Sequence, residues 1–154
     1  MKKGFTLIEL LVVIGIIAIL AGIVIIAVNP GRQLGQARDA QRWNDVNALL
    51  NGIHQYAVDF DGAFPAVIDN DDATVQIVGT GVACPATCTG QTVAVVCGAN
   101  LTGTLVSDYL QAIPADPQGG SAADSRYYVD ENQTTGRITI GSCDAEQSPI
   151  EVTR

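Results

Sequence analysis

Basic residues are scarce in this sequence. The chain has 8 lysines and arginines against 16 aspartates and glutamates, and from residue 43 onward three arginines stand against fourteen acids. A surface that binds nucleic acid needs a cluster of positive charge, because the phosphate backbone is negative. The acidic C-terminal part is therefore excluded as a nucleic-acid interface. Residues 1–42 have the opposite balance, five basic residues against two acids, which suits a segment beside a membrane.

Residues typical of active sites are also few. His54 is the only histidine, and no serine or cysteine stands near it in the sequence. A histidine base acts on a nucleophile or substrate within hydrogen-bond reach, often with a third group that orients it. The sequence has no phosphate-binding loop and no metal-binding motif with recognisable spacing. We therefore expect a protein that is not an enzyme and needs no cofactor.

A long apolar run is present near the N-terminus. Residues 10–28 are 19 consecutive positions without a polar side chain. At about 1.5 Å per residue, a helix of this length crosses most of a hydrocarbon core of roughly 30 Å. A cleaved secretory signal has a shorter run followed by a small-x-small site, which does not fit here. Lys2 and Lys3 predict a cytoplasmic N-terminus, so the rest of the chain is expected outside the inner leaflet.

Glu9 is the residue of this segment whose burial would cost the most free energy. A carboxylate buried in apolar surroundings without a partner costs several kcal/mol or takes up a proton. The sequence leaves two interpretations open. Glu9 lies at the headgroup level, where the positive end of a helix dipole favours it, or it meets a cation that the chain itself does not supply.

Residues 2–11, KKGFTLIELL, resemble the class III signal of type IV pilins and of the pseudopilins of type II secretion. In that signal a short basic leader ends in glycine, and phenylalanine, a glutamate and an apolar helix follow. The resemblance implies that a membrane prepilin peptidase cuts after Gly4 and methylates the new amine of Phe5. It also implies a docking role for Glu9, whose carboxylate would meet the Phe5 amine of a neighbouring subunit in a filament.

The pattern after the apolar run predicts an interruption and then a second helix. Pro30 lacks an N–H and Gly31 is a weak helix former, so a kink is expected near residue 30. From Trp43 onward, apolar residues recur at three-, four- and seven-residue steps with polar residues between them. This spacing predicts an amphipathic helix, which the turn residues after Phe60 end.

Short β-branched runs predict the remaining structure. They lie at residues 74–78, 92–96, 126–130 and 137–141, and a helical turn is expected at 105–110. The order of a helix followed by strands indicates an α+β fold, with a small antiparallel sheet packed against the long helix. We accordingly expect a leader at 1–4, a transmembrane and filament-core helix at 5–28, an amphipathic helix at 29–64 and an extracytoplasmic β-rich head at 65–154.

Four cysteines lie in the head, and an even number outside the cytoplasm predicts two disulfides. They are Cys84, Cys88, Cys97 and Cys143. Three pairings remain possible, and a zinc site is disfavoured by the ligand spacing. The resemblance to secretion pseudopilins also implies calcium near the C-terminal loop, for which Asp116, Asp124 and Asp130 are the weak candidates.

These observations predict a structural subunit that polymerises through its apolar helix into a type IV pilus-like surface filament after leader cleavage. A major pseudopilin of type II secretion is the alternative that the same signal allows. A membrane-anchored extracytoplasmic binding module is an alternative of a different class. The resemblance implies several partners: copies of the chain, prepilin peptidase, and the assembly platform with its ATPase. The precursor is expected in the inner membrane and the product at the cell surface.

Overall fold

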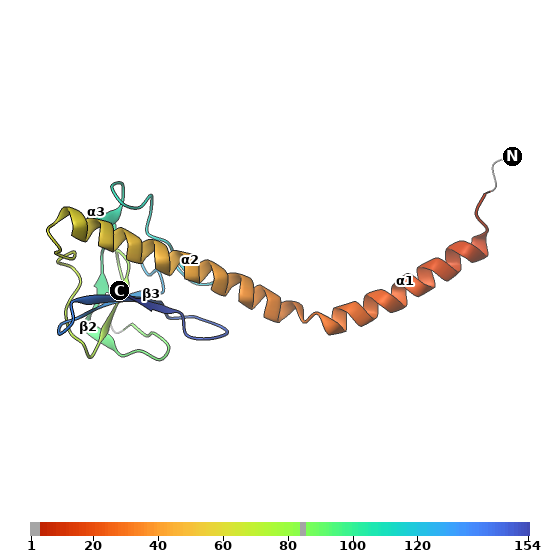
Figure 1. Cartoon of the computed structure of the whole chain (residues 1–154). Coiled ribbons are helices and arrows are strands. Elements are labelled where there is room, and N and C mark those ends of the chain that lie inside the picture. The colour runs from red at the N-terminus through yellow and green to blue at the C-terminus, as the bar shows by residue number, and fades with distance from the viewer. Residues whose placement is uncertain (1–3, 84–85) are drawn as a thin grey trace. The chain divides into compact units, whose positions relative to one another are not determined.

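The computed structural model describes residues 4–83 and 86–154. It divides into two compact units, Met1–Gly35 and Gln36–Arg154. Along the chain (Figure 1) the elements are α1 Leu7–Ala27, α2 Pro30–Asp59, β1 Val75–Val78, β2 Val93–Ala99, α3 Thr102–Leu105, β3 Tyr127–Asn132, β4 Arg137–Ser142 and β5 Glu151–Thr153.

The predicted interruption near Pro30 is confirmed. α1 ends at Ala27 and α2 begins at Pro30. Asn29, between them, has a positive φ of 25°, and its side-chain oxygen accepts a hydrogen bond from the Arg32 amide at 3.3 Å. Asn29 therefore caps α2, and proline follows at the first helical position, where its missing N–H costs nothing.

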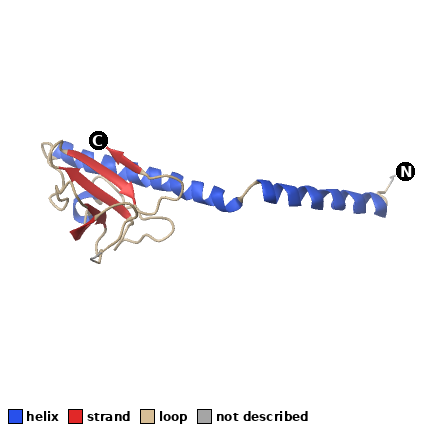
Figure 2. Cartoon of the chain, turned by 90° about the horizontal axis from the view of Figure 1, so that it is seen from below, coloured by secondary structure: helices blue, strands red, loops and turns tan. Residues whose placement is uncertain are grey.

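The sheet confirms the α+β prediction and corrects one detail of it. The strand order is β2-β1-β3-β4-β5, and Figure 2 shows α2 beside the strands. Every pairing is antiparallel except that of β1 with β2, which is parallel. A parallel pair needs a connection of about a dozen residues or more, and residues 79–92 supply it. Because strand direction is not encoded in a strand's own residues, the sequence pattern did not reveal it.

The core lies between α2 and one face of the sheet. Four fully buried side chains of α2, Val46, Leu49, Leu50 and Ile53, pack in one cluster with Tyr127, Val129, Ile138 and Ile140 of β3 and β4. The α2 residues recur at three- and four-residue steps and the strand residues at two-residue steps, as helix and strand faces require. A smaller cluster on the other face contains Val75, Ile77, Tyr128 and the bonded pair Cys88 and Cys143.

All four predicted strands are present, but two short elements were missed. β5 is a three-residue strand that pairs with β4, and α3 ends at Leu105, the residue where the predicted helical turn begins. Such short elements depend on tertiary pairing more than on local pattern. α2 ends at Asp59, short of the expected residue 64, and Asp61 and Gly62 turn the chain with positive φ values of 54° and 90°.

Candidate functional site

The residues of the predicted cleavage site are accessible. Gly4, Phe5 and Thr6 precede the first turn of α1, and Phe5 is 90% exposed. A Cβ added at Gly4 would meet no atom within 4 Å. The segment can therefore reach a protease without unfolding the helix behind it. Cleavage and methylation themselves stay predictions.

Glu9 has a partner within its own chain, which the sequence analysis missed. The Thr6 amide and hydroxyl both donate to Glu9 Oε2, at 3.0 and 2.9 Å, and the Glu9 amide donates to the Thr6 hydroxyl at 3.3 Å. This reciprocal arrangement is a capping box, in which two helix-end donors are satisfied together. The signal was available in the sequence as Thr followed three residues later by Glu, directly before the apolar run.

α1 exposes its apolar side chains. None of its residues is buried, and its mean hydropathy reaches 3.3 over 18 residues, enough in length and composition to cross a membrane. Apolar side chains surround the whole helix, so it has no polar face that water could solvate. A helix of this kind requires lipid or other apolar helices around it.

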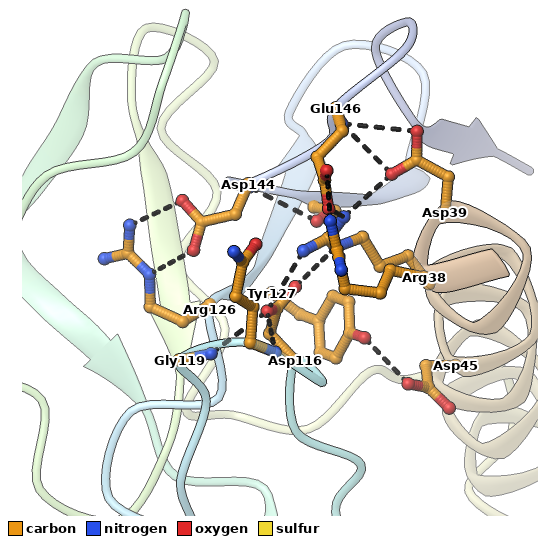
Figure 3. A network of polar contacts seen from close by, with 12 residues as sticks. Arg38, Asp39, Asp45, Asp116, Gly119, Arg126, Tyr127, Asp144 and Glu146 are labelled. Carbon is orange, nitrogen blue, oxygen red and sulfur yellow. Dashed lines mark hydrogen bonds and ion pairs between the residues drawn. The ribbon is translucent and has the colours of Figure 1, made fainter. Parts of the chain in front are cut away.

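In the head, a network of ion pairs is centred on Arg42. Figure 3 labels its partners Asp39, Asp116 and Glu146. The Arg42 side chain is fully buried, and it donates to Asp116 at 2.5 and 3.2 Å, to Asp39 at 2.8 Å and to Glu146 at 3.1 Å. Arg38 adds two hydrogen bonds to Glu146, at 2.5 and 2.6 Å. The network thus joins two successive turns of α2 to two loops that lie far away in the sequence.

Backbone groups complete the network. Asp39 accepts from the amides of Glu146 and Gln147, and Asp116 accepts from the amide of Gln118 at 2.8 Å. The loop is tight at Gly120, where a Cβ would lie 2.2 Å from the Asp116 nitrogen. Glycine is therefore required there for the loop to hold Asp116 against Arg42.

The electrostatics follow from these contacts. Burial alone would raise the pKa of Asp116, but the hydrogen bonds from Arg42 and Gln118 outweigh it and the pKa is lowered. The hydrogen bonds from Arg38, assisted by Arg42, lower the pKa of Glu146 from 4.5 to about 2. The pKa of Arg42 is raised, chiefly by Asp116. All of these groups are therefore charged at neutral pH, and the network is structural rather than a proton-transfer site.

A disulfide and a second ion pair tie the C-terminal strands to the residue 86–92 loop. Cys88 is bonded to Cys143 across 55 positions of sequence. Arg126 holds Asp144 with two hydrogen bonds of 2.7 and 2.8 Å and also reaches the Thr87 carbonyl. Cys97 is disulfide-bonded as well, and no described cysteine is free. Cys84 lies outside the described residues.

The three calcium candidates have other neighbours. Asp116 is held by Arg42, and Asp124 lies 3.9 Å from Arg126. Asp130 has a raised pKa because of burial and the nearby Asp72, Asp69 and Asp71. Within residues 4–83 and 86–154, no group of three or more His, Cys, Asp or Glu side chains is placed to share a metal ion. Calcium binding stays a prediction.

His54 packs on the edge of the Phe64 ring, with 6.1 Å between ring centroids. Its buried Nε2 has no hydrogen-bond partner among the described residues. The imidazole is therefore part of the packing at the end of α2.

Comparison with known proteins gives one match. Residues 1–25 match the family described as the prokaryotic N-terminal methylation motif. The match spans the leader, Phe5, Glu9 and most of α1. No curated protein and no solved structure matches the chain. The matched family thus covers the N-terminal segment, and the head lies outside it.

Proposed function

We propose that this chain, which carries the class III signal of a type IV pilin-like or pseudopilin precursor, is the structural subunit of a type IV pilus-like surface filament. In this proposal the precursor is anchored in the inner membrane by α1. It is cut after Gly4 and methylated on Phe5, and it then polymerises through α1. The chain is a structural protein, acts without a cofactor, and works by assembling with copies of itself.

The observation that carries the proposal is that no residue of α1 is buried, next to the matched signal. Burial of apolar surface contributes about 25 cal/mol per Å², so a helix exposed on every side gains much by packing with other helices of the same kind. Lipid meets this need in the precursor. A bundle of α1 helices meets it after the subunit leaves the membrane.

Glu9 supports the same proposal. The described hydrogen bonds of the capping box use its Oε2 atom, so Oε1 remains open to a further donor. In a bundle without water, that oxygen needs a partner, because an unpaired buried charge is costly. The amine that cleavage creates on Phe5 of a neighbouring subunit is a cation of the right charge. Processing and assembly are therefore coupled in this proposal.

The first test is the N-terminus of the assembled protein. Surface filaments sheared from cells should contain a subunit that begins at Phe5 with one added methyl group, as measured by intact mass spectrometry. Gly4→Val should leave the uncut precursor in the membrane, because a side chain obstructs the cleavage site. A mature chain that begins after Ala21 or Ala27 would contradict the proposal and indicate an ordinary signal peptide.

The second test separates the pilus from the two alternatives. In cells that lack this chain, loss of surface filaments with normal protein secretion supports the pilus. Loss of secretion, without any surface filament in the parent cells, supports the pseudopilin. A subunit correctly cut but found only as single copies in the membrane supports the binding module.

A further inference from the structure

The two edges of the sheet are protected to different degrees. β5 is three residues long, with exposed Glu151 at its start and Arg154 directly after it. β2 is seven residues long and has no charged residue. Natural sheets protect their edges with short strands, charges, proline or β-bulges, because an open edge invites other chains. β5 is protected by its shortness and by its charged residues, and β2 has neither of these two features.

Two apolar side chains of β2 are exposed. Val95 is 95% exposed and Val96 is 70% exposed. β1 advances only from Val75 to Ile77 while β2 advances from Val93 to Gly98, so residues 94–97 form a bulge. A bulged strand bends away from its partner. The two valines therefore lie at the outer margin of the sheet, because β2 is an edge strand.

The bulge is held in place from inside the head. Gln76 on β1 is 2% exposed, and its side-chain amide donates to the Val96 carbonyl at 3.3 Å. The same amide group accepts from the Asp69 amide at 2.8 Å. Because the buried Gln76 side chain binds both the Asp69 amide and the Val96 carbonyl, it fixes the bulge in one position. Val95 and Val96 are thus presented by a defined structure and not by a loose loop.

Charge favours another copy of the chain as the occupant. The chain has a net charge of −8, and from residue 43 onward it has fourteen acids against three arginines. Two such heads repel one another over most of their surface. The stretch of residues 73–107, which contains β1 and β2, has no charged residue at all. Asp69 lies beside Gln76 at the Val96 end of this edge, but the stretch itself adds no charge. Two heads therefore meet less Coulomb repulsion there than over the rest of their surface, and burial of the valines adds a favourable term.

We propose that the β2 edge, defined by Val95 and Val96, is a contact surface between the heads of adjacent copies in the filament. This inference rests on the proposed function, because it needs copies held side by side. It adds a head contact to the packing of α1. The contact uses apolar side chains at the bulge, since the bulge itself disturbs the regular hydrogen bonding that a further strand would need.

The first experiment introduces a charge at the edge. Val95→Lys and Val95→Glu should each lower the amount of sheared filament at least about tenfold relative to membrane-inserted subunit, because either charge would be desolvated in the contact. Val58→Lys is the matched control, since Val58 is an 81% exposed valine on α2. Equal filament yields from the Val95 variants and the control would overturn the inference.

The second experiment identifies the occupant directly. Benzoylphenylalanine in place of Val95, irradiated in native filaments, should give a crosslinked dimer in which mass spectrometry finds two copies of this chain. The same group in place of Val58 serves as the control. A crosslink to a different protein, or none, overturns the inference while the filament stands. If wild-type cells form no filament, the proposed function fails and the inference with it.

Discussion

α1 and the head differ in how their apolar side chains are buried and how their charged side chains are paired. α1 is apolar on every side, none of its residues is buried, and its one carboxylate is bound locally by Thr6. The head buries a core of its own between α2 and the sheet. Its buried Arg42 is paired with Asp116 and Glu146, which lie 74 and 104 residues further along. The stability of α1 therefore depends on its surroundings, and that of the head on its own contacts.

This difference separates the effects of mutation. A change in α1 should alter insertion or assembly and leave the unfolding of the head unchanged. A change in the Arg42 network or the disulfide should lower head stability first. Filament yield and head unfolding, measured on the same variants, therefore test whether α1 and the head respond independently to mutation.

The largest effect is expected at Glu9. Glu9→Ala should reduce filament yield by about tenfold or more, because the unpaired Phe5 amine must then be desolvated alone. Glu9→Gln separates charge from capping, since glutamine still closes a capping box. Both variants should insert in the membrane and give the wild-type unfolding curve for the head. A normal filament yield with Glu9→Gln would show that capping matters and the charge does not.

The second effect concerns the buried arginine. Arg42→Met should lower the free energy of unfolding of the head by about 3–5 kcal/mol, because Asp116 would remain buried without its cation. Thermal or denaturant unfolding of the full chain in detergent, followed by circular dichroism, measures this. Arg137→Met is the control, since Arg137 is exposed on β4. If both variants unfold alike, the network does not stabilise the head.

The third effect concerns the disulfide between Cys88 and Cys143. Replacing both by serine should cost about 2–4 kcal/mol of head stability, because the unfolded chain loses the restriction of a loop that spans 55 positions. The same unfolding measurement applies. The amount of membrane-inserted precursor should not change, since α1 lies outside the loop. A loss of insertion would contradict the independence of the two regions.

The fourth effect is a pH dependence confined to the head. The pKa of Glu146 is lowered from 4.5 to about 2 by Arg38 and Arg42. As the pH falls, the unfolded chain takes up this proton before the folded chain does. The stability that Glu146 contributes is therefore complete above about pH 5 and is lost as the pH falls toward 2. Glu146→Gln should flatten this part of the profile.

Arg38→Gln provides an independent check of the cause. Without the Arg38 hydrogen bonds, the pKa of Glu146 should move back toward its ordinary value, and the pH-dependent loss should become smaller. An unchanged profile would mean that other carboxylates, such as Asp39 and Asp116, determine the acid sensitivity of the head.

The sequence predicted the architecture better than the polar contacts. An uninterrupted apolar run located α1, helical periodicity located α2, and β-branched runs located four strands, because each of these signals lies in the local sequence. These signals did not reveal the parallel pairing of β1 with β2, or the network of Arg42 with Asp116 and Glu146. Those partners are distant in sequence, and a lone arginine on a helix is usually exposed. The capping box was missed as well, although Thr6 and Glu9 are only three residues apart and the sequence alone carries their motif.

The smallest effect is expected at Thr6, and it tests whether α1 is organised locally at its first turn. Thr6→Ala removes the hydroxyl that binds both the amide and the carboxylate of Glu9, at a cost of about 1 kcal/mol. Thr6→Ser is the control, because it keeps the hydroxyl. Hydrogen exchange of the full chain in detergent should be faster at the Glu9 amide in Thr6→Ala and unchanged in Thr6→Ser. Exchange within the head should be the same in all three proteins.

The same variants also give an expectation for assembly. In Thr6→Ala, Glu9 can still accept hydrogen bonds from the backbone amide of residue 6 and from the Phe5 amine of a neighbouring subunit, so filament yield should fall far less than in Glu9→Ala. A loss as large as that of Glu9→Ala would mean that the Thr6 hydroxyl acts in assembly itself, and that local capping is not its main role.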